Sequence, residues 1–137
     1  MCGICGIIGP GDKGKQESIV RGMMERLKHR GPDGSGLHQE DGFSFGHQRL
    51  AVIDLENGTQ PMKSPDGRFT LVFNGEIYNY IELREKLTLE GVQFQTSSDT
   101  EVLLQVFIRY GENAFAELNG MFAFALFDAK EKRWILG

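Results

Sequence analysis

The chain has 137 residues, of which 40% are hydrophobic and 25% charged, with a formal net charge of −4. This length and balance are typical of one globular domain and exclude disordered and fibrous proteins. The longest apolar run, residues 121–127, is far shorter than the roughly 20 residues of a membrane helix, and the first residues lack the pattern of a secretory leader. We therefore expect a cytoplasmic protein that binds no membrane and, with its negative charge, no nucleic acid.

Helical and strand periodicities both occur along the chain. Apolar residues at helical spacing predict helices over about residues 16–30, 79–91 and 98–111, the last opening with a capping-box pattern. A basic cluster falls in the last turn of the first helix, where the helix dipole favours cations, so we interpret it as a helix end: Arg26, Lys28, His29 and Arg30. Strands are predicted over residues 3–8, 37–40, 43–46, 49–53, 69–73, 121–128 and 133–137.

The loops indicate how these strands pair. Turn signals at residues 40–42 and 65–67 separate extended runs, which favours antiparallel hairpins over strand-helix-strand crossovers. Both alternating faces of residues 121–127 are apolar, so this strand is expected to be covered on both sides, as in a layered α+β sandwich. The strand at 133–137 ends with no turn or partner after it, and we expect the sheet to be truncated there, with further strands beyond it.

The two cysteines stand at positions 2 and 5. Their C-x-x-C spacing invites a redox or zinc interpretation, but residues three apart in a strand point to opposite faces with Cα atoms about 10 Å apart, too far for a disulfide. Cys5 is expected to be a small buried residue. Removal of Met1 leaves Cys2 with both a thiol and a free α-amine that can act as a base near neutral pH. Cys2 is therefore a candidate nucleophile.

Other positions add candidate binding groups. Asn74 and Gly75 end a predicted strand and offer a side-chain amide and a backbone N–H to one oxyanion, although the pair also suits a plain turn. Arg49 opens a predicted strand and can bind a carboxylate, or be a solvated strand arginine. Asp99 can bind an ammonium group, or only cap its helix.

Several motifs occur in an order that carries a family resemblance. They are MCGI at 1–4, HRGPD at 29–33, RLAVID at 49–54, NGEIYN at 74–79, SDTE at 98–101 and NGMFAFA at 119–125. Together they resemble the glutamine amidotransferase domain of glutamine-hydrolysing asparagine synthetases, a class II family with an N-terminal nucleophile. The RGPD and NGEIYN forms are more similar to this branch than to the phosphoribosylpyrophosphate or glucosamine-phosphate branches.

The resemblance implies a four-layer αββα sandwich of antiparallel sheets, the fold of N-terminal nucleophile hydrolases. Residues 1–137 then form the N-terminal part of a type 2 glutamine amidotransferase domain. It implies that Cys2 attacks the side-chain carboxamide of glutamine, forms a thioester and releases ammonia and glutamate. The other implied roles are an oxyanion hole from Asn74 and Gly75, carboxylate binding by Arg49, ammonium binding by Asp99 with Glu76, and a pocket wall from the backbone of Leu50 and Val52.

Members of the family continue into an ATP-dependent synthetase domain that accepts the ammonia. Residues 1–137 contain neither a glycine-rich phosphate loop nor a Ser-Gly-Gly motif, so no cofactor or metal is expected in them. The implied partner is a C-terminal synthetase domain that uses ATP and Mg²⁺ to convert aspartate to asparagine, and the resemblance also allows a homodimer. Alternatives stay open: a glutaminase domain feeding another acceptor, a non-catalytic relative with the same fold, or a small thiol redox or zinc module.

Overall fold

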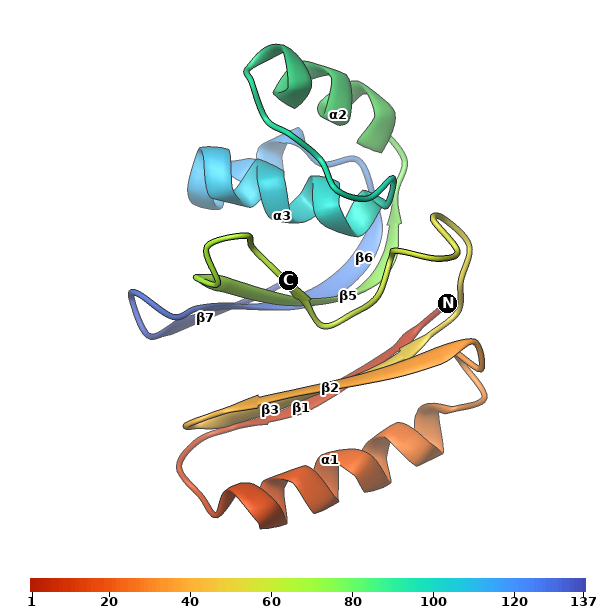
Figure 1. Ribbon diagram of the computed structural model, residues 1–137, viewed down its shortest axis with the longest axis vertical. Coiled ribbons are helices and arrows are strands. Elements are labelled where there is room, and N and C mark those ends of the chain that lie inside the picture. Colours follow the sequence, from red (N-terminus) through yellow and green to blue (C-terminus); the bar gives the residue numbers. More distant parts are fainter.

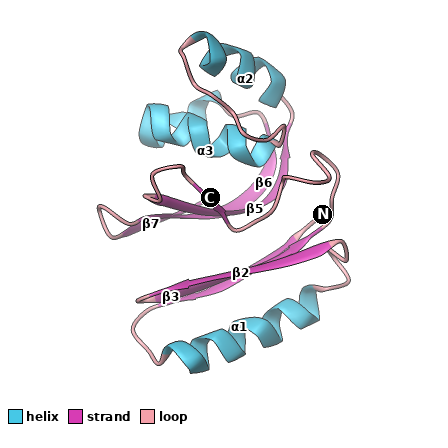
Figure 2. Cartoon of the chain, viewed as in Figure 1, coloured by secondary structure: helices cyan, strands magenta, loops and turns pink.

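A computed structural model describes residues 1–137 as two antiparallel sheets stacked between helices (Figure 1). The elements in chain order are β1 (Gly3–Ile8), α1 (Lys13–Leu27), β2 (Gly34–Glu40), β3 (Phe43–Arg49), β4 (Met62–Lys63), β5 (Phe69–Ile77), α2 (Tyr80–Leu89), α3 (Asp99–Tyr110), a 3-10 helix η1 (Gly111–Glu117), β6 (Gly120–Asp128) and β7 (Arg133–Leu136). The sheets have the orders β1-β3-β2 and β4-β5-β6-β7. Helix α1 covers one outer face, and α2 and α3 lie beyond the other (Figure 2). The predicted αββα layering is confirmed.

Strand β3 is longer than the strand predicted over residues 43–46. Gly46, where the first was expected to end, pairs with both Cys5 and Leu37, so β3 runs on to Arg49. The strand predicted over residues 49–53 was wrong, because the chain after Arg49 curls into a loop. The Arg49 guanidinium donates hydrogen bonds to the carbonyl oxygens of residues 53–55 in that loop, and Asp54 adopts a left-handed φ of 49° that no extended strand accommodates.

Strand β5 extends past its predicted end at residue 73, so Asn74 and Gly75 lie inside a strand rather than at its end or in a turn. It pairs with β6 along its length, with Gly75 opposite Phe122. On its other side the short strand β4, which was not predicted, pairs only with Thr70 and Leu71. From residue 72 onward, this edge of β5 has no partner strand.

The three predicted helices are present with shifted ends. Helix α1 starts at Lys13 rather than near residue 16, because Asp12 caps it by accepting a hydrogen bond from Lys15 N at 2.7 Å. It stops before residues 28–30, which form tight turns. Asn79 precedes α2 without capping it, and its side-chain amide instead bonds the backbone of residues 117 and 119. None of the helices combines the length and the apolar character that a membrane span requires.

Alternation along the strands divides the core into two apolar layers. Leu71 and Phe73 of β5 pack in the larger cluster with residues of α2 and α3, whereas Val72 joins Phe43 in the cluster between the sheets. The prediction that β6 is covered on both faces holds only for its second half. Met121 is 54% exposed, because the cluster between the sheets reaches no further along β6 than Ala125.

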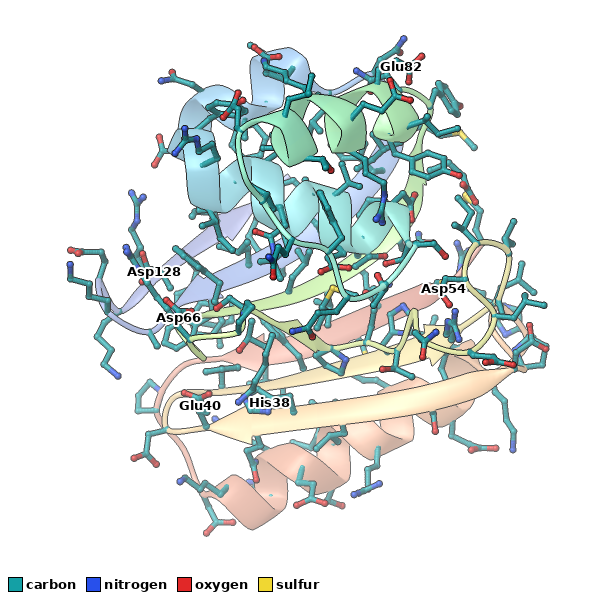
Figure 3. All side chains as sticks on the ribbon, turned by 45° about the horizontal axis from the view of Figure 1, so that its top comes forward. His38, Glu40, Asp54, Asp66, Glu82 and Asp128 are labelled. Atoms are coloured by element: carbon teal, nitrogen blue, oxygen red, sulfur yellow. The ribbon has the colours of Figure 1, made fainter.

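Asp128 ends β6 beside the start of β5, as labelled in Figure 3. Arg68 donates from Nε to Oδ1 at 2.9 Å and from Nη2 to Oδ2 at 2.6 Å, while the aspartate side chain is only 1% exposed. These hydrogen bonds lower the pKa of Asp128 to about 2. The carboxylate is thus enclosed while Arg68 stays partly exposed, and the backbone N–H groups of Lys130 and Glu131 also donate to Asp128 Oδ1.

We expect Asp128→Asn to reduce the free energy of unfolding by about 1–3 kcal/mol near neutral pH, because Arg68 loses its ionised partner. The pKa of Asp128 in the folded state lies below its ordinary value of 3.8. The stabilisation that its ionised carboxylate provides is therefore complete well above pH 3.8 and is lost as the pH falls toward about 2. Unfolding curves recorded across this range should show the wild type and the variant converging. The control Asp41→Asn removes an ion pair whose aspartate is 92% exposed, and should leave the unfolding curve unchanged within experimental error. A constant difference down to the lowest pH would contradict this account.

Candidate active site

Inward-facing residues of three strands meet at one end of the sandwich. Cys2 immediately precedes β1 on the face of Ile4, Arg49 ends β3 on the face of Phe43, and Asn74 shares the inward face of Val72. The N-terminus accordingly lies between the two sheets at this end (Figure 1). The loop after β3, in which Figure 3 labels Asp54, lies at the same end.

The two cysteine thiols have different surroundings. Cys2 Sγ lies 3.3 Å from Leu50 N, which donates to it, and 3.6 Å from Leu50 O. Cys5 faces the opposite way, toward α1, where its thiol contacts the carbonyl oxygens of Val20 and Gly46 and burial raises its pKa. Both cysteines are free, and no three His, Cys, Asp or Glu side chains are grouped as metal ligands would be. The C-x-x-C spacing therefore does not bring the thiols together.

A cavity of about 70 Å³ opens beside Cys2. Such a volume is far below the ~300–1,000 Å³ of sites for drug-sized ligands, so the cavity suits a small metabolite. The residues that line it are Met1, Cys2, Arg49, Leu50, Val52, Ile53, Gly58, Gln60, Phe73, Gly75, Glu76, Ser98, Asp99 and Thr100. Every predicted site residue except Asn74 is among them. Asn74 Oδ1 lies buried nearby in β5 without a hydrogen-bond partner.

The free edge of β5 supplies backbone groups to this cavity. Phe69 O accepts from Ser64 N on this edge, and alternation turns the N–H groups of residues 73, 75 and 77 to the same side. Ile77 N donates to Asp99 Oδ2 at 3.2 Å, whereas no strand accepts from Gly75 N. Glycine is required at position 75 because a Cβ there would lie 2.4 Å from Met121 O.

Asp99 provides a buried negative charge on the far wall of the cavity. It is 6% exposed, and burial raises its pKa, with the Glu76 carboxylate adding to the effect and the bond from Ile77 N opposing it. Ser98, not Asp99, caps α3 by accepting from Glu101 N. The alternative in which Asp99 serves only as a helix cap is therefore wrong, and its carboxylate is available to a cation.

Arg49 is not a solvated strand arginine. Nη1 and Nη2 bond the loop carbonyls of residues 53–55, which leaves Nε without a protein acceptor. Gly58 packs against the guanidinium so closely that a Cβ there would lie 2.6 Å from Nη2. The loop thus fixes the cation at the mouth of the cavity that Cys2 and Asp99 also line.

Arg30 is a site residue that the sequence analysis missed. Its Nε donates to Cys2 O at 2.9 Å, so it holds the backbone of the candidate nucleophile. Its basic cluster was interpreted as a helix end, and Arg30 otherwise entered only as part of the HRGPD motif, without a role at the site. The sequence signal was the glycine that directly follows it, Gly31. The structure explains this glycine, because a Cβ there would lie 2.3 Å from Gln48 O where the turn packs against β3.

The sequence profile of the glutamine amidotransferase domain matches residues 1–137. The chain belongs to this family. The amidotransferase domain is 43% identical over 134 residues to asparagine synthetase [glutamine-hydrolyzing] 1 of Bacillus subtilis, covering 96% of this chain and 21% of that protein. It is also 43% identical over 137 residues to asparagine synthetase [glutamine-hydrolyzing] 2 of Arabidopsis thaliana, covering 98% of this chain and 23% of that protein. The chain therefore spans about a fifth of the length of these curated relatives.

Solved structures support the same assignment for the amidotransferase domain. Glutamine phosphoribosylpyrophosphate amidotransferase from B. subtilis, complexed with ADP and GMP, superposes with a TM-score of 0.76 at 27% identity, covering 94% of this chain and 35% of that one. A second structure, the allosteric regulatory enzyme of purine biosynthesis, gives 0.76 at 26% identity, covering 94% of this chain and 36% of that one. The expected N-terminal nucleophile hydrolase fold is confirmed, as is membership of a glutamine-hydrolysing amidotransferase family.

Proposed function

We propose that this domain hydrolyses L-glutamine to glutamate and ammonia with Cys2 as the nucleophile. The observation that carries the proposal is the meeting of the Cys2 thiol, the unpaired Gly75 N–H edge and the buried Asp99 carboxylate around one small cavity. After removal of Met1, the α-amine of Cys2 accepts the thiol proton and the thiolate attacks the carboxamide carbon. The same proton leaves with ammonia, and water then hydrolyses the thioester to glutamate and a free thiol.

The remaining site residues bind the substrate in this proposal. The Asn74 side-chain amide and Gly75 N–H donate to the oxyanion of the tetrahedral intermediate. Arg49 binds the α-carboxylate with Nε–H and donors that it shares with the loop, and Asp99, with Glu76, binds the α-ammonium group. The backbone of Leu50 and Val52 completes the wall. Arg30 holds the Cys2 carbonyl and so fixes the direction of the thiol.

The destination of the ammonia is a further part of the proposal. The similarity to asparagine synthetases supports a synthetase domain in the complete protein that uses ATP and Mg²⁺ to convert aspartate to asparagine. We further propose that the enzyme acts in the cytoplasm and forms a homodimer. Sedimentation of the complete protein tests the homodimer, and asparagine formation from aspartate, glutamine and ATP tests the acceptor.

The glutaminase proposal is tested by the intact mass of the complete protein before and after exposure to a diazo-ketone analogue of norleucine. We expect loss of the Met1 mass and one adduct that maps to Cys2, with protection by L-glutamine. A folded protein that lacks Met1 but leaves Cys2 unlabelled and releases no glutamate would overturn the proposal. It would place the domain among non-catalytic relatives.

Arg49→Ala should raise KM for glutamine by about 30-fold or more and change kcat much less, because the α-carboxylate loses its partner before and during the reaction. Steady-state glutamate release measures both constants. A matched substrate separates carboxylate binding from loop support: 4-aminobutanamide lacks the α-carboxylate, so the variant should lose little activity toward it. An equal loss toward both substrates would assign Arg49 to the loop alone. Arg109→Ala, at an exposed ion pair with Glu90, serves as the control.

Glutamine binding should weaken at acidic pH through Asp99. The ionised carboxylate binds the ammonium group, and because burial raises the pKa of Asp99, protonation begins at a higher pH than for an ordinary aspartate. KM should therefore rise as the pH falls through this raised pKa. Asp99→Asn should have a KM at least ~10-fold higher that no longer varies over this range. Asp66→Asn, in the turn before β5, should keep the wild-type profile, and a wild-type profile in Asp99→Asn would contradict the assignment.

A further inference from the structure

The peptide groups of Phe73 are held by two side chains instead of a strand. Phe73 directly precedes Asn74 and Gly75, at a point of β5 that β4 does not reach. Its N–H donates to Gln60 Oε1 at 2.6 Å, and its carbonyl accepts from His47 Nε2 at 3.2 Å. Gln60 is 8% exposed and His47 1%. Two buried side chains thus take the place of the missing strand beside the cavity.

Gln60 also connects this edge to the opposite wall. Its Nε2 donates to Thr100 Oγ1 at 3.3 Å, and Thr100 follows Asp99 in the first turn of α3. The backbone of Gln60 is itself fixed against β2, since a Cβ on Gly36 would lie 1.9 Å from Gln60 O. One side chain therefore bridges the strand that carries Gly75 and the helix that carries Asp99.

His47 supports the carbonyl in one defined form. Burial lowers the pKa of His47 to about 4, so the ring is neutral near physiological pH. A carbonyl oxygen only accepts, which requires the proton on Nε2 and leaves Nδ1 as the acceptor atom, and Nδ1 is buried without a partner. The ring thus acts as a single fixed donor to Phe73 O.

We propose that Gln60 is a positioning residue for the oxyanion site of Asn74 and Gly75. His47 supports the same segment of β5 through its bond to Phe73 O. The inference rests on the proposed glutaminase function. Without an acceptor from Gln60, the buried Phe73 N–H must move to find another partner. Because Asn74 and Gly75 are the next residues in the chain, they are displaced with it. Oxyanion donors act by being fixed before the reaction, and a displacement of about 1 Å costs roughly 100-fold in rate. Gln60 therefore determines the rate of acyl transfer without touching the reacting atoms.

The test compares Gln60 variants of the complete protein. Gln60→Met keeps the shape but removes the acceptor, and should lower kcat by about 10–100-fold with KM within about threefold. Gln60→Glu retains an acceptor for Phe73 N–H and can accept from the Thr100 hydroxyl, so it should restore kcat to within about fivefold. The side chain of Gln60→Asn is one methylene shorter, so its amide oxygen does not reach Phe73 N–H, and this variant should behave like Gln60→Met. Gln105→Met is the matched control, because Gln105 is also 8% exposed and lines a different cavity.

A second readout separates positioning from general damage. Alkylation of Cys2 by iodoacetamide is a displacement that forms no oxyanion, so its rate should stay within about twofold in Gln60→Met while kcat falls. Equal loss of alkylation and kcat, or wild-type kcat in Gln60→Met, would overturn the inference. If Gln60→Met does not fold, rescue by Gln60→Glu but not by Gln60→Asn supports it, and the same kcat in both overturns it. Absence of hydrolysis and of labelling in the wild type would instead overturn the glutaminase proposal.

Discussion

Cys2→Ala should abolish glutamine hydrolysis, with kcat at least ~10⁴-fold lower, because the only group placed to attack the carboxamide is lost. Glutamine binding should stay within about threefold of wild type, since Arg49 and Asp99 keep their positions and the thiol contacts only the backbone of Leu50. Glutamate release measures the loss, and calorimetric titration with glutamine measures the retained binding. Binding without turnover is the expected combination.

Two controls make this result specific. Cys5→Ala alters a thiol that faces α1 and should leave kcat within about threefold, because Cys5 lies outside the cavity. Insertion of a lysine between Met1 and Cys2 keeps the thiol but removes the free α-amine, and should lower kcat as severely as Cys2→Ala. Full activity in the insertion variant would contradict the role of the amine as base.

Asn74→Ala should lower kcat by about 100–1,000-fold with little change in KM, because the amide donates to an oxygen that becomes charged only in the transition state. Its side chain lies on the inward face of β5, and because its Oδ1 has no hydrogen-bond partner, the substitution deprives no other group of that acceptor. Steady-state kinetics of the complete protein separate the two constants.

The control for Asn74→Ala is Asn113→Ala, at an exposed position of η1 away from the cavity, which should leave both constants within about threefold. Asn74→Asp keeps the shape but places a negative charge beside the oxyanion, so its kcat should be no higher than that of Asn74→Ala. A raised KM with normal kcat in Asn74→Ala would move Asn74 from transition-state stabilisation to ground-state binding.

The sequence predicts those features of the site that depend on local backbone geometry, such as the direction of a side chain on a strand. The strand period alone predicted that Cys2 and Cys5 face opposite ways, and the structure confirms it. The motifs around Arg49, Gly75 and Asp99 identified residues that all line one cavity. Sequence spacing succeeds here because each residue's direction follows from its place on a regular element.

The rest depends on contacts between distant segments. A strand is the natural prediction after Arg49 because residues 50–53 are all apolar, yet the arginine binds the carbonyls that follow it and the chain bends there. Gln60 lies in a loop without periodicity and gains its importance only from Phe73 and Thr100, which local patterns do not relate to it. The shortness of β4 likewise depends on the packing of the whole sheet rather than on its own sequence.

That shortness has a consequence for engineering. A β4 lengthened to run beside Phe73 and Gly75 would replace the Gln60 and His47 contacts of Phe73 with strand pairing and bond the Gly75 N–H, a kind of change sought in thermostabilised proteins. In the proposed mechanism the Gly75 N–H binds the oxyanion, so we expect the longer β4 to lower kcat. Programmes that select this domain for heat resistance should therefore leave the gap unfilled, and short extended peptides that fill it are a rational starting point for inhibitors.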